Sequence, residues 1–335
     1  MHRDGPTRFI PPHVLAEHHQ RLFRLACHKR RNHQLLRWLT AQGLLTDRLA
    51  RLRTCHAWMT YRYEPDRQRF HLIQTRSCDL PLLCPLCAIR RAARACDAYQ
   101  YRVQVLLNAD PRLLLSYAVL TIHNQDDLRE RFDHLRTCAR QLLARRQAAD
   151  SARRGHRQFR YATRCCLAEV RGGAYSFEVK RGANSGLWHP HLNLLLLSPQ
   201  PLDERRLRDE WRALTRDSHN VYCRTRPNDP STFVEIFKYA LKFSDLCPAD
   251  TYHAFQVLAG RRLMGSFGQF RGVTVPGVEP SADESCRLLF YRYTQGAYRC
   301  FSDWLLSGAS YVTGRNTEDS TSGTKTTSRE EPPVT

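Results

Sequence analysis

The stretch "GLWHPHLNLLLLS" (residues 186–198) places two histidines, separated by one proline, at the start of a run of leucines. The leucines predict a buried central β-strand, whereas Pro190 fits only at a strand start or edge because it donates no ladder hydrogen bond. Alternate residues of a strand point to the same face, so His189 and His191 are expected to project together. Two adjacent imidazoles at the end of a core strand form a suitable grip on a divalent ion.

A third ligand is expected, since two histidines leave a catalytic metal site incomplete. Glu178 lies in "YSFEVKRG" (175–182), on the preceding predicted strand, and a glycine-containing turn joins that strand to His189. Antiparallel pairing would present its carboxylate beside the imidazoles. The alternative is an edge-strand glutamate that faces solvent. A set of two histidines and one carboxylate with open positions suits Mg²⁺ or Mn²⁺ acting on phosphate.

Helix and strand patterns alternate on both sides of this stretch. Strand-like runs occur at 111–124, 164–170, 173–181 and 220–226, and helical patterns occur at 126–146, 201–217 and 231–245. Residues 14–50 have helical spacing and predict two helices. The sequence therefore predicts an α+β fold with a largely antiparallel sheet that carries helices on one face.

The overall charge points to a polyanionic partner. Lys and Arg number 52 against 32 Asp and Glu, a formal net charge of +20. Nucleic acid is favoured over an acidic membrane surface. No run of about 18 apolar residues exists, which excludes a spanning helix. The first residues lack the apolar segment of a secretory signal, so a cytoplasmic protein is expected.

Cysteine spacing predicts a structural zinc site. The chain has 13 cysteines, and without a secretory signal a cluster of them indicates metal binding or catalysis rather than disulfides. A Zn²⁺ ion would join the hairpin predicted between residues 55 and 78, with its Glu-Pro-Asp turn, to the CxxC pair that follows. The predicted ligands are Cys55, Cys78, Cys84 and Cys87. His56 is the substitute ligand, and the remaining cysteines are expected to be buried thiols.

Two arginine-rich segments are candidates for contact with DNA. "IRRAAR" (89–94) follows the CxxC pair on a predicted helix, and loop 151–164 interleaves arginines with aromatic residues that could stack on unpaired bases. The candidate DNA-binding residues are Arg90, Arg91, Arg94, Arg157 and Arg160. A solvated basic face for the helix and a flexible linker for the loop are the alternatives.

A third motif lies on the helix predicted at 231–245. In "EIFKYALK" (235–242), Glu235 and Tyr239 share a face, with Lys242 nearby. Taken alone, this is typical of an ordinary amphipathic helix. Together, "LTIHN" (120–124), "WHPHLN" (188–193) and "VEIFKYALK" (234–242) resemble the three motifs of HUH endonucleases, most closely the single-tyrosine initiators of plasmid rolling-circle replication. "CPLCAIRR" (84–91) and "RRLMGSFGQFRGV" (261–273) extend the resemblance over roughly residues 50–273.

The resemblance implies a specific chemistry. A bound Mg²⁺ or Mn²⁺ polarises a phosphate of single-stranded origin DNA, and Tyr239 attacks it with assistance from Lys242. A 5′-phosphotyrosyl enzyme and a 3′-OH primer result, and Glu235 acts as general base at termination. The implied partners are single-stranded and hairpin origin DNA and the host helicase and polymerase, with no membrane. One departure is Asn193, where the family often has a third histidine.

The expected organisation has five parts. These are a basic helical segment (1–50), a zinc-binding module (51–97), an HUH-type endonuclease domain (98–246), a C-terminal extension (247–313) and a disordered tail (314–335). Two rival functions remain open. One is an HUH transposase or relaxase, and the other is a zinc-dependent DNA-binding protein without catalysis, which leaves Tyr239 without a role.

Overall fold

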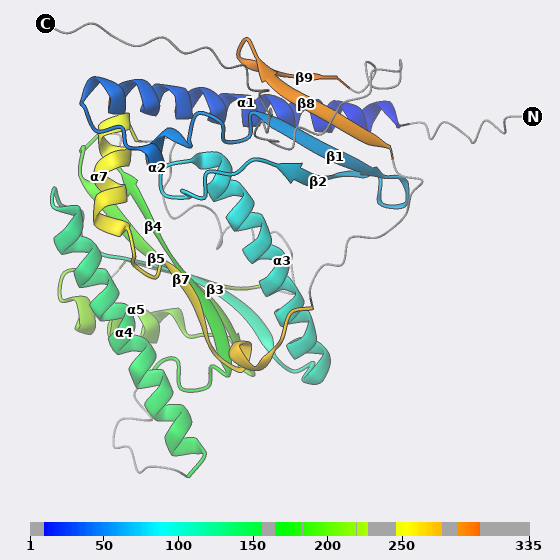
Figure 1. Ribbon diagram of the computed structural model, residues 1–335. Coiled ribbons are helices and arrows are strands. Elements are labelled where there is room, and N and C mark those ends of the chain that lie inside the picture. Colours follow the sequence, from blue (N-terminus) through cyan, green and yellow to red (C-terminus); the bar gives the residue numbers. More distant parts are fainter. Residues whose placement is uncertain are drawn as a thin grey trace, which may run out of the picture.

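A computed structural model describes residues 10–155, 165–182, 184–218, 220–226, 246–276 and 287–301. The fold is α+β, with two antiparallel sheets and a helical N-terminal segment (Figure 1). Within the described residues, the larger sheet has the strand order β6-β3-β5-β4-β7 and the smaller sheet the order β2-β1-β8-β9. No helix of these ranges combines the length and the apolar character needed to cross a membrane.

The elements have the following bounds. The helices are α1 (Pro12–Ala41), α2 (Asp47–Ala50), α3 (Pro85–Ala109), α4 (Leu128–Arg153), α5 (Glu204–Thr215) and α7 (Pro248–Leu258), with 3-10 turns η1 (Pro65–Arg67) and η4 (Gln269–Gly272). The strands are β1 (Trp58–Glu64), β2 (Arg69–Thr75), β3 (Leu114–Thr121), β4 (Gly172–Arg181), β5 (Trp188–Ser198), β6 (Val221–Arg226), β7 (Met264–Gly268), β8 (Leu288–Thr294) and β9 (Ala297–Cys300).

Local sequence signals account for most of these elements. Asp127 and Asp203 cap α4 and α5 by accepting hydrogen bonds from the backbone N–H groups of Glu130 and Arg206. The strands predicted within 111–124 and 220–226 are present, as is the hairpin whose turn begins at Pro65. The helix predicted at 231–245 lies outside the described residues.

The strand predicted at 164–170 was wrong, because residues 165–170 form turns. Side chains bind the backbone of this segment in place of a neighbouring strand. The Arg146 guanidinium donates to the carbonyl oxygens of Val170 and Arg171, and the Cys166 N–H donates to Glu210. This strand-like run therefore becomes a turn once its polar backbone groups are satisfied elsewhere.

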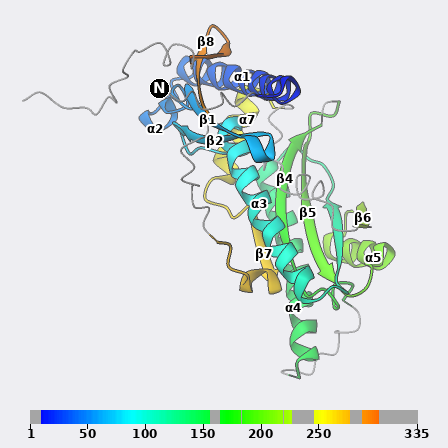
Figure 2. The same ribbon diagram turned by 90° about the vertical axis from the view of Figure 1, so that its right-hand side faces the viewer.

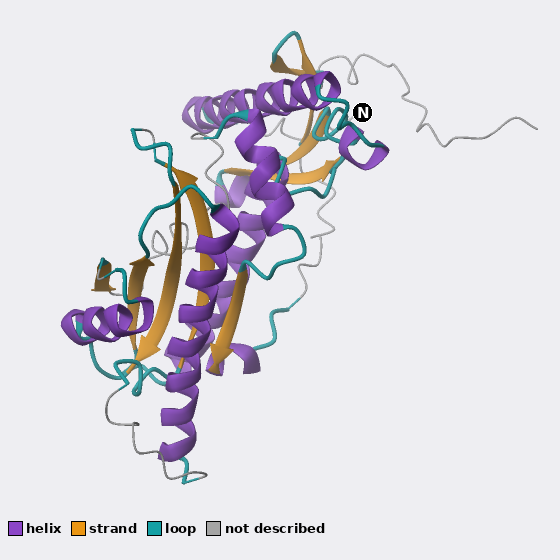
Figure 3. Cartoon of the chain, turned by 90° about the vertical axis from the view of Figure 1, so that its left-hand side faces the viewer, coloured by secondary structure: helices purple, strands orange, loops and turns teal. Residues whose placement is uncertain are grey.

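Strand β5 lies at the centre of the larger sheet, hydrogen-bonded to β3 on one edge and β4 on the other. Leu192, Leu194 and Leu196 face a core that they share with residues of α4, α5 and α7. Figure 3 shows helices lying beside the strands of this sheet. Leu195 and Leu197 face the opposite side.

Helices cover both faces of this sheet, which corrects the expectation of helices on one face only. Tyr99 and Val103 of α3 pack with Leu195 and Leu197 on the second face, and Figure 2 shows α3 passing along the sheet. The reason is that leucines occupy both alternating positions at this end of β5, so both sides require apolar cover.

The smaller sheet packs one face against α1. Tyr61 and Tyr63 of β1 and Leu289 and Tyr291 of β8 form a core with the leucines of that helix. Strand β8 pairs antiparallel with β1, so a segment near the C-terminal end of the described chain completes the sheet of the β1–β2 hairpin.

His18 of α1 is buried in this small core. Its ring stacks on Phe70 with 3.9 Å between centroids, and neither ring nitrogen has a hydrogen-bond partner among the described residues. Burial lowers the pKa of His18 to about 3, with the nearby charges of Arg21 and His19 acting in the same direction.

The depressed pKa of His18 predicts a pH dependence of stability. From its ordinary value of 6.5 down to about 3, the unfolded chain binds a proton that the folded chain does not. Stability is therefore fully present above pH 6.5 and falls as the pH drops. Replacement of His18 by Phe is expected to flatten this dependence, measured as urea unfolding midpoints from pH 7 to pH 5. The same replacement at exposed His13 is the control, and an unchanged slope in the His18→Phe variant would contradict the assignment.

Candidate metal centres

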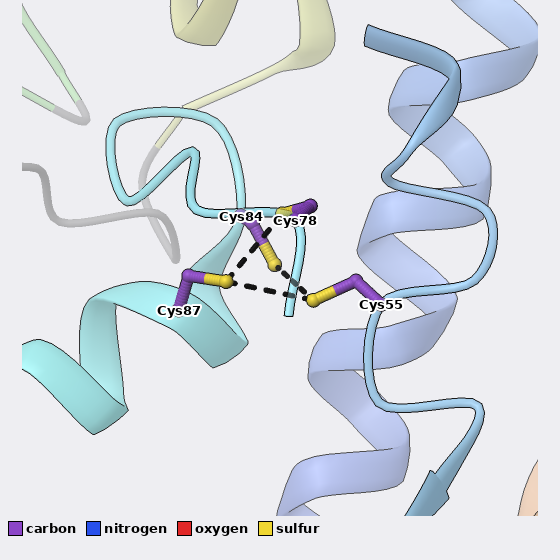
Figure 4. A group of neighbouring side chains, drawn as sticks. All are labelled: Cys55, Cys78, Cys84 and Cys87. Carbon is purple, nitrogen blue, oxygen red and sulfur yellow. Dashed lines mark hydrogen bonds between the residues drawn. The ribbon is translucent and has the colours of Figure 1, made fainter. Parts of the chain in front are cut away.

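Four cysteine side chains converge where the hairpin, α3 and α1 meet (Figure 4). Cys55 precedes β1, Cys78 follows β2, Cys84 caps α3 and Cys87 lies in its first turn. All four are buried, and their sulfur atoms lie within 4.8 Å of one another. The sequence prediction of this set is confirmed at the level of geometry: four buried cysteines are placed as if to bind a metal such as zinc.

The sulfur separations fit a tetrahedral ion. Cys55 Sγ lies 3.5 Å from the sulfurs of Cys84 and of Cys87, and Cys78 Sγ lies 3.4 Å from that of Cys87. A disulfide requires about 2.05 Å between sulfurs. A tetrahedral Zn²⁺ with bonds of about 2.3 Å sets neighbouring sulfurs about 3.8 Å apart. A small expansion of the cluster would therefore accommodate the ion, and four protein ligands make a closed, structural site.

His56, the predicted substitute ligand, is next to the cluster but outside the four-cysteine set. It is buried, and its Nδ1 lies 3.2 Å from Cys55 Sγ. Burial lowers the pKa of His56 to about 4, against the effect of the Cys87 charge, so the ring is neutral at neutral pH. Because the four sulfurs already suit a tetrahedral ion, His56 is not needed as a ligand.

Two polar residues of α1 hold the cluster from the side. Buried Lys29 donates from Nζ to the carbonyl oxygens of Arg53 at 2.7 Å and of Cys55 at 2.6 Å. Asn32 donates from Nδ2 to Cys84 Sγ at 3.0 Å. Burial lowers the pKa of Lys29, and the negative charges of Cys55, Cys84 and Cys78 oppose that shift. A lysine ammonium at this position compensates part of the negative charge of four thiolates.

Sequence reasoning missed Lys29 and Asn32, although a signal was present. Both lie within the apolar stripe of α1 that contains Leu22, Leu25 and Leu36. A lysine and an asparagine inside such a stripe indicate buried polar partners.

The cluster predicts that the protein carries one zinc ion per chain. Replacement of Cys84 by Ser removes one ligand and is expected to weaken zinc binding by more than about a hundredfold and to lower the melting temperature. Zinc content is measured by a colorimetric chelator after release with a mercurial reagent. Exposed Cys247→Ser is the matched control. Metal-replete wild-type protein without zinc, or full zinc in the Cys84→Ser variant, would contradict the prediction.

A second group of predicted ligand side chains lies at the end of β5 in the larger sheet. His189 and His191 project to the same face, with 5.6 Å between their ring centroids. Glu178 of β4 pairs directly opposite His191, and its Oε2 lies 3.0 Å from His191 Nε2. The structure thus places Glu178 beside the imidazoles, as antiparallel pairing predicted. Its side chain is 17% exposed, although the pairing with β7 covers only Gly172–Ser176 of β4.

Neighbouring side chains orient this group. Asn124, in the loop that follows β3, contacts His189 Nδ1, and Tyr117 donates to Asn193 Oδ1 at 3.0 Å. Asn193 also hydrogen-bonds Glu178. The residue that stands where the resembling family often has a third histidine therefore positions the carboxylate. Sequence reasoning missed Asn124 and Tyr117, since neither belongs to a recognisable spacing with the histidines.

The electrostatics keep this group ready to bind a cation. Burial, reinforced by the charges of Lys180 and His191, lowers the pKa of His189 to about 4, which leaves the ring neutral at neutral pH. Burial raises the pKa of Glu178, but the hydrogen bond and charge of His191 outweigh it, so the net shift is downward and the carboxylate is ionised. His191 Nδ1 is buried and has no hydrogen-bond partner among the described residues.

The donor atoms of this second group do not all converge on one point. Among the described residues, the four cysteines are the group in which at least three ligand atoms lie within 4.8 Å of one another. The two histidines and Glu178 do not meet this distance. His189 instead contacts Asn124, while His191 contacts Glu178.

The remaining predicted site residues divide into two sets. Arg90, Arg91 and Arg94 lie on α3, with Arg91 and Arg94 exposed. The following predicted residues lie outside the described residues: Arg157, Arg160, Glu235, Tyr239 and Lys242.

Comparison with known proteins returned no match, whether against protein-family models, curated proteins or solved structures.

Proposed function

We propose that the chain is a metal-dependent single-strand DNA endonuclease and strand transferase of the HUH type, which initiates rolling-circle replication of a plasmid. One observation carries the proposal. His189 and His191 project side by side from the end of a central strand, with the carboxylate of Glu178 in contact with His191. Two imidazoles and one carboxylate gathered at one strand end are typical ligands of a divalent ion.

Two of the three residues already lie at the separation that a divalent ion requires. Neighbouring donor atoms bound at about 2.1 Å to an octahedral ion lie about 3.0 Å apart, and His191 Nε2 lies 3.0 Å from Glu178 Oε2. The neutral ring of His189 offers a lone pair after a modest rotation away from Asn124. Two imidazoles and one carboxylate leave open positions for water or phosphate. Mg²⁺ or Mn²⁺ bound there would polarise a phosphoryl oxygen of the scissile phosphate.

The same face carries groups suited to a nucleic-acid strand. Lys180 pairs with His189 across β4 and β5, so both side chains lie on one face. Across β3, exposed Tyr222 and Arg224 of β6 also lie on this face, with the guanidinium 5.1 Å from the tyrosine ring centroid. Cations that meet phosphates and an aromatic ring that stacks on a base support a single strand running past the metal ligands.

Tyr239 is the proposed nucleophile. Its phenolic oxygen bonds to phosphorus as the bond from phosphorus to the 3′ oxygen breaks, and the phenolic proton passes to a nearby base. The 3′ oxygen takes up a proton and becomes the primer end, while the 5′ phosphate stays on the tyrosine. Lys242 favours the phenolate by its positive charge, and Glu235 activates a water or a terminal hydroxyl at the end of the cycle. The substrates are single-stranded and hairpin origin DNA, and the host helicase and polymerase extend the primer.

A transposase or relaxase would use the same chemistry on another DNA. A second candidate function is zinc-dependent DNA binding without catalysis. The cysteine cluster favours it, because the four sulfur atoms already lie close enough together to bind one ion. The two classes differ in whether Tyr239 is required.

The proposal predicts a covalent adduct between protein and DNA. Protein, Mn²⁺ and end-labelled single strands that cover the host replicon are incubated and run on a denaturing gel. A labelled band at protein mass is expected, and it should be lost with EDTA and with Tyr239→Phe. His191→Ala is expected to reduce adduct formation by a hundredfold or more, since it removes a metal ligand (about 10²–10⁴-fold effects are typical of such groups).

Two controls make this result specific. Tyr101→Phe changes an exposed tyrosine of α3 and should leave the adduct unchanged. His13→Ala does the same for an exposed histidine of α1. Absence of an adduct on every replicon strand, with DNA binding intact, would reject nicking and favour the non-catalytic zinc protein.

A further inference from the structure

The smaller sheet has a second face that points away from α1. Alternate residues of β1 and β8 enter the core with α1, whereas the residues between them face outward. The strand register arranges the outward residues in three rows that cross the sheet. The first row is Arg299, Arg292 and Trp58; the second is Phe301, Phe290, Thr60 and Gln74; the third is Leu288, Arg62 and His71. We call these residues the outer face.

Large apolar side chains are exposed on the outer face. Trp58 is 40% exposed, Leu288 41% and Phe301 37%. Phe301 is held beside Phe290 by a backbone hydrogen bond of 2.8 Å from its N–H to the Phe290 carbonyl oxygen. Aromatic rings thus stand on β1, on β8 and directly after β9, while the opposite side of the same sheet forms a core with α1. A group of exposed apolar side chains on one sheet face is typical of a binding surface.

Positive charge surrounds these rings. Arg292 and Arg299 stand directly opposite each other on β8 and β9, and both are exposed. Like charges in directly opposed positions of a sheet are unfavourable unless an anion lies between or above them. No acidic residue occupies any position of the three rows, and Glu64 at the rim is engaged by Arg69 at 2.9 Å. The outer face is therefore complementary to a polyanion.

We propose that the outer face binds single-stranded nucleic acid, with unpaired bases stacked on Trp58 and Phe301 and the phosphates of the strand on Arg292 and Arg299. An antiparallel four-stranded sheet that presents aromatic rings and arginines offers this combination of stacking and charge. A duplex does not expose base faces for stacking, so a single strand is favoured over a duplex. An acidic protein would use the arginines but would not require the rings.

This surface is a binding site apart from the proposed nicking site. The two lie on different sheets, and α3 connects them (Figure 1). The outer face would anchor the strand while another part of it is presented to the histidines. Binding by the outer face does not depend on cleavage, so it stands or falls without the proposed endonuclease activity.

The test measures DNA binding in protein that cannot nick. Tyr239→Phe protein, loaded with zinc and kept in EDTA-free buffer without Mn²⁺, is titrated into a fluorescein-labelled single strand of about 30 nucleotides from the host replicon. In this background, Trp58→Ala is expected to raise the Kd about tenfold, since loss of one stacked base has an effect of this size. Binding should also quench tryptophan fluorescence, and Trp58→Phe should reduce that quenching while it retains most of the affinity.

A charge variant tests the arginines separately. Arg292→Gln with Arg299→Gln is expected to lower the slope of log affinity against log salt by about 1.4, because each phosphate contact on a single strand contributes about 0.7. The matched control is Arg129→Gln with Arg140→Gln, which removes the same charge from exposed positions of α4. Circular dichroism and zinc content verify that every variant is folded.

Three results would overturn the proposal. One is unchanged affinity in the Trp58→Ala protein. Another is equal binding of a duplex of the same sequence, or equal competition by polyglutamate, which would make the outer face a general polyanion surface. The third is a control variant that loses as much affinity as the Arg292 and Arg299 variant. If binding follows the prediction but no covalent adduct forms with Mn²⁺, the outer face stands and the proposed endonuclease activity fails.

Discussion

Hydrogen bonding of β5 to a neighbour on each edge commits its alternate side chains to opposite faces of the larger sheet, and the other parts of the fold depend on this alternation. From Trp188 to Leu196 the residues that face α4, α5 and α7 are apolar, so they build the main core. On the other face the strand changes from histidines and an asparagine to leucines. Helix α3 covers the leucines, and the polar end is left without an apolar partner. A polar group beside a tightly packed core is therefore a direct result of the order of residues in one strand.

The cysteine cluster controls where α3 can lie. Cys84 and Cys87 hold the first turn of this helix against the hairpin, and Tyr99 and Val103, further along, pack on the larger sheet. A helix of 25 residues is about 37 Å long. Fixing its N-terminal end therefore also determines where its C-terminal end lies. Metal bound by four thiolates would thus stabilise the smaller core directly. Through α3 it would also stabilise the packing of Tyr99 and Val103 on the larger sheet. Buried Lys29 and Asn32 extend the same support to α1.

Sequence patterns predicted the features that depend on residues close in the chain. The same-face histidines, the antiparallel placement of Glu178, the hairpin and the set of four cysteines follow from strand alternation and short spacings. The features that were missed depend on distant partners. β8 pairs with β1 across most of the chain, α3 turns back over the second face, and Arg146 converts an apolar run into a turn. The placement of Tyr239 relative to the histidines stays a prediction, because the helix that would carry it lies outside the described residues.

The central claim is that His189, His191 and Glu178 bind a catalytic divalent ion. Its most direct test is isothermal titration of Mn²⁺ into zinc-loaded protein without DNA. The account predicts one site of moderate affinity that is lost in His191→Ala and weakened in Glu178→Gln, while zinc content and circular dichroism stay unchanged. Retention of the Mn²⁺ site by a variant that lacks both histidines, or absence of any site in wild-type protein even when single-stranded DNA is present, would contradict it.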